Sequence, residues 1–153
     1  MTRRVARRRN GTDRSLAATF RCNAAGFHEA AEVALPRHPE VTRYFLAIAI
    51  ELALKAYLLH RGISDDWNRV YLRHDLSKAL RFARRAGFNG APAALPELAT
   101  LLGPYYQVHS ISQMPPKAVA PVCWSQTCTT VRDLIDAVVD AAGREASDHE
   151  GAA

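Results

Sequence analysis

The chain has 153 residues, of which 48% are hydrophobic, 8% aromatic and 23% charged. This composition is ordinary for a globular protein and excludes a collagenous, a disulfide-stapled or a wholly disordered chain. A chain of this length fits one domain with one core, and the net charge of +5 is a first indication of a nucleic-acid partner.

The excess positive charge lies near the N-terminus. Residues 1–21 carry seven arginines and one aspartate, whereas the rest of the chain carries 13 basic and 14 acidic side chains. We therefore expect a flexible Arg-rich tail over residues 1–14, a single helical domain over residues 15–143 and a polar C-terminal tail over residues 144–153. The Arg-rich tail is expected to bind nucleic acid or an acidic partner; an extension without function is the alternative.

Apolar periodicity predicts helices from the start of the domain. A first helix is expected over residues 15–35, where apolar residues recur at spacings of three and four, and Pro36 ends it. A second helix, over residues 41–60, is apolar on nearly every side, which is typical of the central helix of a bundle. Gly62 is placed to cap this helix in a left-handed conformation.

Shorter elements follow the central helix. A short segment over residues 67–73 leads into a third main helix over residues 76–86, with Asp75 as its N-cap and Gly87 at its end.

The last third of the chain alternates between helical and irregular patterns. A fourth helix is expected over residues 95–109 with an interruption at Gly103-Pro104, then irregular chain over residues 111–122 and a last helix over residues 125–142. No alternating strand pattern occurs. The sequence therefore predicts an all-α fold, an antiparallel up-and-down bundle of four to five helices.

Several classes of protein are disfavoured by the placement of Cys, His and charged residues. Cys123 and Cys128 are separated by four residues rather than two, and the histidines lack ligand-like spacing, so no metal and no cofactor are expected. The most apolar segment, residues 44–59, is too short for a membrane span and contains Glu51 and Lys55. We expect a cytoplasmic protein with reduced thiols and no membrane segment.

Glu51 and Lys55 stand one helical turn apart in the order that favours an ion pair. One interpretation is a structural ion pair in the central helix. The other is that both side chains line a polar groove or a dimer interface.

Two motifs in the middle of the chain resemble a known family. The segment Ala49–Leu59 contains the Glu51/Lys55 pair, and Gly62 and His74-Asp75-Leu76 follow it. In this order they resemble the HEPN superfamily of small bacterial helical domains, over roughly residues 15–110; many members carry the second motif as Gly-His-Asp-Leu or a similar sequence. The resemblance implies an up-and-down bundle that is often a homodimer. Some members are metal-independent ribonucleases of toxin or defence systems, and others bind nucleotides or RNA without catalysis.

The nuclease members resemble one another in an Arg followed by four to six residues and a His, and Arg69 and His74 meet this spacing. The resemblance implies that His74 transfers a proton to or from a ribose oxygen while Arg69 stabilises the charge on phosphorus. RNA transesterification usually uses two proton-transfer groups, so we expect a homodimer that brings two copies together. The alternative is that His74 only fixes the loop beside Asp75.

A basic stripe is predicted on the third main helix. Lys78, Arg81 and Arg85 share one face, Arg84 is adjacent and Arg73 lies upstream. The stripe would bind RNA phosphates; a solvated outer face is the alternative.

The aromatic cluster Tyr105, Tyr106 and His109 is interpreted as packing, with base stacking as the alternative.

Together these features predict an HEPN-like domain that acts on RNA, as a metal-independent endoribonuclease of a toxin or defence system with an antitoxin partner. The alternative is a non-catalytic dimeric interaction or nucleotide-binding module that assists a partner nucleotidyltransferase.

Overall fold

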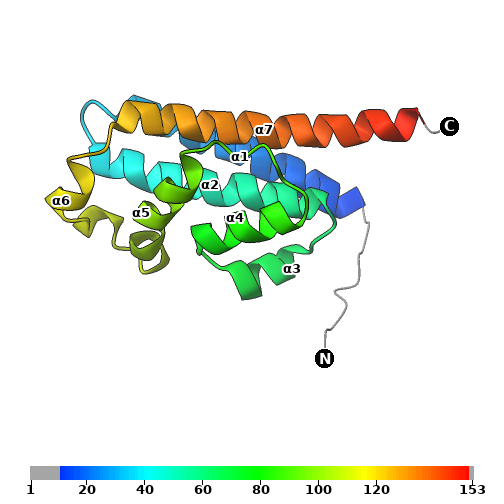
Figure 1. Ribbon diagram of the computed structural model, residues 1–153, viewed down its shortest axis with the longest axis horizontal. Coiled ribbons are helices and arrows are strands. Elements are labelled where there is room, and N and C mark those ends of the chain that lie inside the picture. Colours follow the sequence, from blue (N-terminus) through cyan, green and yellow to red (C-terminus); the bar gives the residue numbers. More distant parts are fainter. Residues whose placement is uncertain (1–10, 152–153) are drawn as a thin grey trace.

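The computed structural model of the chain describes residues 11–151 (Figure 1). Within that range the chain forms seven α-helices, one π-helical turn and one 3-10 turn, and it forms no strand. The expected all-α fold is therefore confirmed. None of the helices in this range has both the length and the apolar character that crossing a bilayer requires.

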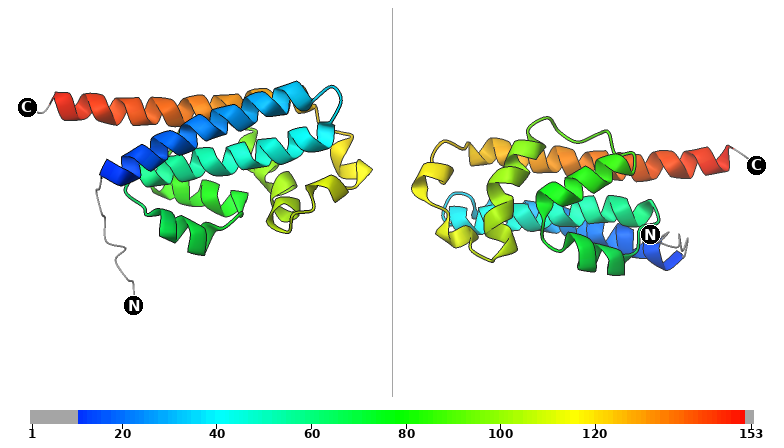
Figure 2. Two further views of the ribbon diagram at one scale, coloured as in Figure 1. Left: turned by 180° about the vertical axis from the view of Figure 1, so that it is seen from behind. Right: turned by 60° about the horizontal axis from the view of Figure 1, so that its bottom comes forward.

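Three long helices lie side by side and form the body of the molecule (Figures 1 and 2). They are α1 (Gly11–Ala34), α2 (Pro39–His60) and α7 (Trp124–Glu150). The views show α1 antiparallel to the other two. Helix α2 packs against α1, α4, α5 and α7 and buries most of its residues, which confirms its predicted central position.

Both ends of α2 follow from local sequence. Pro39 occupies the first turn of α2. Backbone N–H groups in the first turn have no acceptor within the helix, so proline, which lacks this group, is tolerated there. Gly62 has φ +88°, and the N–H of Ile63 donates to the carbonyl of Leu58 at 3.0 Å, as in a glycine-capped helix end. The predicted cap at Gly62 is confirmed.

A short helical segment connects α2 to the next core helix. Helix α3 (Asp65–Trp67) runs directly into the π-helical turn η1 (Asn68–Leu72), and helix α4 (Leu76–Arg85) follows. The carboxylate of Asp75 accepts the N–H of Lys78 at 3.0 Å, so the predicted N-cap is confirmed.

Helix α5 (Leu95–Gln107) is continuous, and the predicted interruption at Gly103-Pro104 is wrong. Pro104 is exposed and lies in the last turn of the helix. Proline lacks the N–H that would complete one backbone hydrogen bond, and here the lost bond is on the solvent side near the end of the helix. The core contacts of α5 keep the helix intact. The predicted irregular stretch contains two short elements, η2 (Ile111–Gln113) and α6 (Pro116–Val119).

The outer helices extend beyond their predicted limits. Of the predicted tail over residues 1–14, residues 1–10 lie outside the described residues, and residues 11–14 form the first turn of α1. Helix α7 continues through Gly143 to Glu150, so the predicted polar tail is largely helical. Once a helix exists, each added residue contributes a hydrogen bond, and a single glycine in α7 costs only about 1 kcal/mol.

Candidate functional site

The carboxylate of Glu51 is the centre of a buried polar cluster. Its Oε1 accepts a hydrogen bond from Lys55 Nζ at 2.6 Å and lies 2.9 Å from His74 Nδ1, and its Oε2 accepts the hydroxyl of Tyr106. Glu51 is 7% exposed and Lys55 is 8% exposed. The two sequence motifs and the end of α5 therefore meet at one carboxylate.

Lys55 connects the central helix to the turn that precedes α4. Besides its ion pair with Glu51, its Nζ donates to the carbonyl of Arg73 at 2.7 Å. A buried ion pair is tolerated only when the remaining polar atoms are also hydrogen-bonded. Both partners meet that condition here, because each has a further bond to the segment over residues 73–74.

The bond to Glu51 determines how the His74 imidazole is oriented. A carboxylate can only accept, so the Nδ1 of His74 carries the proton that it donates to Glu51. The Nε2 edge then carries the lone pair in the neutral ring. The His74 side chain is 45% exposed, and its Nε2 makes no hydrogen bond with any residue from 11 to 151.

His74 borders a surface cavity of about 580 Å³ between the turn before α4 and the end of α5. Two cations, Arg73 and Lys78, and one acid, Asp75, border the same cavity. Exposed apolar surface comes from Val70, Tyr71 and Val108. The cavity therefore combines an oriented imidazole, positive charge and surfaces on which a base can stack.

Tyr106 packs as predicted and also takes part in the polar cluster. It is buried, and its ring lies 5.3 Å from the His74 ring in an edge-on arrangement. Burial and the neighbouring Glu51 carboxylate raise the pKa of the Tyr106 hydroxyl above its usual range. Tyr106 therefore remains a proton-bearing donor to Glu51.

His109 brings a second imidazole to the site. Its ring centroid lies 5.7 Å from that of His74, and its side chain is exposed. The backbone of His109 has φ +54°, a left-handed conformation that histidine adopts uncommonly. This conformation, directly after α5, places the His109 ring beside His74.

The turn before α4 contains a second unusual backbone conformation. Arg73 has φ +48° and ψ −122°, and the N–H of Asp75 donates to the carbonyl of Leu72 at 3.0 Å. These angles match the first central position of a type II′ turn, which glycine normally occupies. Such a conformation costs an L-residue about 1–3 kcal/mol, and the bond from Lys55 to the Arg73 carbonyl helps to hold it.

Arg69 does not join His74 in the cavity. Its side chain is 72% exposed, its Nη1 lies 3.8 Å from Asp66, and it is not among the residues that border the cavity. Within one chain, Arg73 is the arginine that borders the cavity with His74.

The predicted basic stripe is only partly at the site. Arg73 and Lys78 border the cavity, and Lys78 Nζ donates to the carbonyl of Tyr71 at 2.7 Å. The other three members lie exposed further along α4: Arg81, Arg84 and Arg85.

Sequence reasoning missed the hydrogen bond of Tyr106 to Glu51 and the contact of the His109 ring with His74. One signal was present: Glu51 is an acid in an apolar helix, and a single lysine cannot saturate a carboxylate, which accepts up to about four hydrogen bonds. A buried tyrosine hydroxyl also needs a partner. Neither signal, however, identifies which residue meets Glu51.

No family model, no curated protein and no solved structure matches the chain. Among residues 11–151, no three His, Cys, Asp or Glu side chains gather closely enough to hold a metal ion.

Proposed function

We propose that this chain is an HEPN-like domain that cleaves RNA without a metal, with His74 as the proton-transfer residue. The observation that carries the proposal is the 2.9 Å contact between His74 Nδ1 and the buried carboxylate of Glu51. It orients the imidazole, whose Nε2 makes no hydrogen bond with any residue from 11 to 151, and His74 borders the same cavity as Arg73 and Lys78. The resemblance of the Glu51/Lys55 and His74-Asp75-Leu76 motifs to HEPN domains agrees with this role.

In the proposed reaction, Nε2 of His74 takes the proton of a ribose 2′-hydroxyl. The 2′-oxygen attacks the adjacent phosphorus, the bond to the 5′-oxygen of the next nucleotide breaks, and a 2′,3′-cyclic phosphate forms. Glu51 stabilises the imidazolium that results, as a carboxylate does for a histidine base in other enzymes. Arg73 and Lys78 provide positive charge for the phosphate.

His109 is the proposed second proton-transfer group. His109 is not among the residues that border the cavity, but its exposed ring lies 5.7 Å from the His74 ring, where it would reach the leaving 5′-oxygen of a phosphodiester that extends past His74. In this arrangement one chain supplies both groups, and the predicted homodimer is not needed to bring two histidines together.

A toxin or defence role remains part of the proposal. A ribonuclease with an open cavity would damage cellular RNA unless its activity were restrained. An antitoxin that covers Val70, Tyr71 and Val108 would block the cavity, because these exposed apolar residues border it.

The test is incubation of the purified protein with RNA in EDTA. The His74→Ala variant is expected to lose about 10²- to 10⁴-fold in cleavage rate. His38→Ala is the matched control. His38 is an exposed histidine outside the site, and its Nδ1 lies 3.6 Å from the carboxylate of Glu40. Cleavage by His74→Ala at the wild-type rate would exclude His74 as the catalyst.

The same exposed apolar residues favour a second candidate function. Val70, Tyr71 and Val108 are 60%, 56% and 68% exposed, which suits contact with a partner protein. In this alternative the domain is a non-catalytic module that binds a nucleotide and assists a nucleotidyltransferase. Wild-type protein that binds RNA or nucleotide without cleaving it in EDTA would favour this function.

A further inference from the structure

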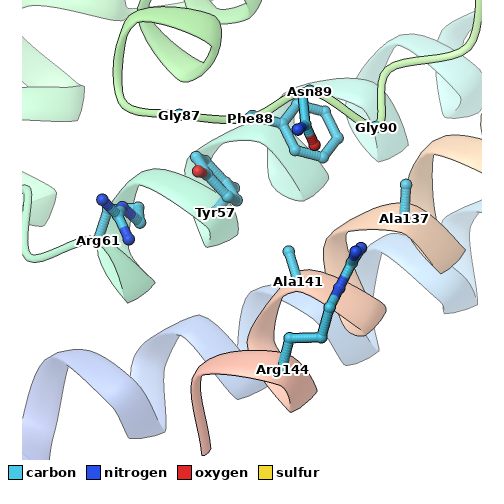
Figure 3. Close-up of a pocket in the computed structure, with 9 residues that line it drawn as sticks. All are labelled: Tyr57, Arg61, Gly87, Phe88, Asn89, Gly90, Ala137, Ala141 and Arg144. Carbon is cyan, nitrogen blue, oxygen red and sulfur yellow. The ribbon is translucent and has the colours of Figure 1, made fainter. Parts of the chain in front are cut away.

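A second cavity lies between the end of α2, the loop after α4 and the stretch of α7 from Ala137 to Arg144 (Figure 3). Its volume is about 180 Å³, and it shares no bordering residue with the His74 cavity. A cavity of this size holds a small molecule or a chemical group and excludes a macromolecular segment.

Two arginines and no acidic residue border this cavity. Arg61 follows the last residue of α2, and Arg144 projects from α7 on the same helical face as Ala137 and Ala141. Figure 3 shows the two arginines toward opposite ends of the cavity, with Tyr57 on the side of Arg61. Both charged side chains at the border of the cavity are therefore cations.

Further hydrogen-bond donors come from the loop after α4. The backbone N–H groups of Asn89 and Gly90 have no acceptor among residues 11–151, and both residues are exposed. Over the same range, the guanidinium of Arg144 makes no hydrogen bond or ion pair, although Asp140 and Asp148 stand four residues away on each side in α7.

The loop after α4 contacts α7 at a glycine, Gly90, which has no side chain. A Cβ atom at Gly90 would lie 3.1 Å from the Cβ of Ala137, which is tighter than normal packing. Gly87 has φ +105°, a conformation that glycine adopts without strain. Glycine at position 90 keeps the loop amides close to α7, and glycine at position 87 allows the turn of the loop beside Tyr57.

We propose that this cavity binds a phosphate monoester of a small organic group. A tetrahedral dianion accepts hydrogen bonds from several directions, which suits a guanidinium and loop N–H groups better than a planar carboxylate does. The phosphate lies on Arg144 and the amides of Asn89 and Gly90. The organic part lies toward Ala141 and the edge of Phe88, which supply apolar surface.

Titration with AMP, inorganic phosphate and adenosine tests this site, with amide NMR shifts of residues 87–90 as a local readout. AMP is expected to shift these amides at lower concentration than inorganic phosphate, and adenosine is expected to leave them unchanged. Equal shifts by adenosine and AMP would overturn the role of the phosphate. Equal affinity for AMP and inorganic phosphate would overturn the role of the organic group.

Substitutions on α7 are expected either to weaken or to strengthen AMP binding at this site. Arg144→Ala is expected to weaken AMP binding at least tenfold, and Ala141→Leu is expected to block it by filling the cavity while both arginines remain. Asp140→Asn is expected to strengthen binding, because it removes a negative charge one helical turn from Arg144 that would repel the phosphate. Arg84→Ala, an exposed arginine on α4, is the control, and thermal melting verifies folding of each variant. Wild-type affinity in both Arg144→Ala and Ala141→Leu would overturn the proposal.

Discussion

His74 and Glu51 are 23 residues apart in the sequence, yet His74 Nδ1 lies 2.9 Å from Glu51 Oε1. The same oxygen accepts a hydrogen bond from Lys55, so the carboxylate orients the imidazole and neutralises the buried amine. One side chain therefore links the stability of the central helix to the chemistry of the site.

A double-mutant cycle at Glu51 and Lys55 measures this buried ion pair. Lys55→Met and Glu51→Gln each leave one buried group without its partner, and each is expected to lower the free energy of unfolding by about 3 kcal/mol or more. The double variant removes both groups and is expected to lose clearly less than the sum. Urea denaturation provides the values, and strictly additive losses would mean that the pair is not coupled.

Removal of the Tyr106 hydroxyl tests the other side of the carboxylate. Tyr106→Phe keeps the ring and is expected to destabilise the fold by about 1.5–3 kcal/mol, because a buried hydrogen bond to a charged group is lost. Tyr105→Phe is the control: the Tyr105 hydroxyl forms no hydrogen bond with residues 11–151, so a change within about 0.5 kcal/mol is expected.

The pH dependence of the same substitution has a definite sign. Burial and Glu51 raise the pKa of Tyr106 in the folded protein, so native Tyr106 keeps its proton above pH about 10, where an unfolded tyrosine ionises. The folded state then binds more protons than the unfolded state, and stability falls as pH rises. The stability advantage of wild type over Tyr106→Phe should therefore shrink above pH about 10; an advantage that grows there would contradict the assignment.

The strained turn predicts an unusual order of stability at position 73. Arg73→Gly and Arg73→Ala both remove the guanidinium, but only glycine adopts φ +48° without strain. We expect the glycine variant to be more stable than the alanine variant by about 1 kcal/mol in denaturant titrations. Both should bind RNA more weakly than wild type. Greater stability of the alanine variant would contradict the turn geometry.

The cysteines provide a chemical test away from the site. The hydroxyl of Ser125 lies 3.3 Å from the thiol of Cys123 and lowers its pKa, whereas burial raises the pKa of Cys128. Because the thiolate is the reactive form, Cys123 should react with iodoacetamide near pH 7.5 well before Cys128. Ser125→Ala should shift the pH dependence of Cys123 labelling to higher pH. An unchanged profile in Ser125→Ala would contradict the role of the hydroxyl.

Local features of the fold could be predicted because their causes lie within a few residues. The caps at Gly62 and Asp75 and the buried course of α2 follow from residue type and apolar pattern. Pro104 shows the limit of such reasoning, since the packing of α5 overrides one missing hydrogen bond near a helix end.

The candidate site could be predicted only in part. Glu51, Lys55 and His74 were identified from motifs, but their meeting with Tyr106 spans 55 residues and depends on how α5 packs against α2. The Arg69–His74 spacing does not reveal the π-helical turn, in which the N–H of Arg73 donates to the carbonyl of Asn68 five residues earlier. Arg69 lies within that turn and projects toward Asp66.

The most direct test of the account is identification of the ends of RNA fragments produced in EDTA by wild type, His74→Ala and Glu51→Gln. We predict fragments with 2′,3′-cyclic phosphate ends for wild type, a rate lower by at least 10²-fold for His74→Ala, and a smaller loss with an altered pH–rate profile for Glu51→Gln. Fragments with the same ends, produced at the wild-type rate by His74→Ala, would contradict the account.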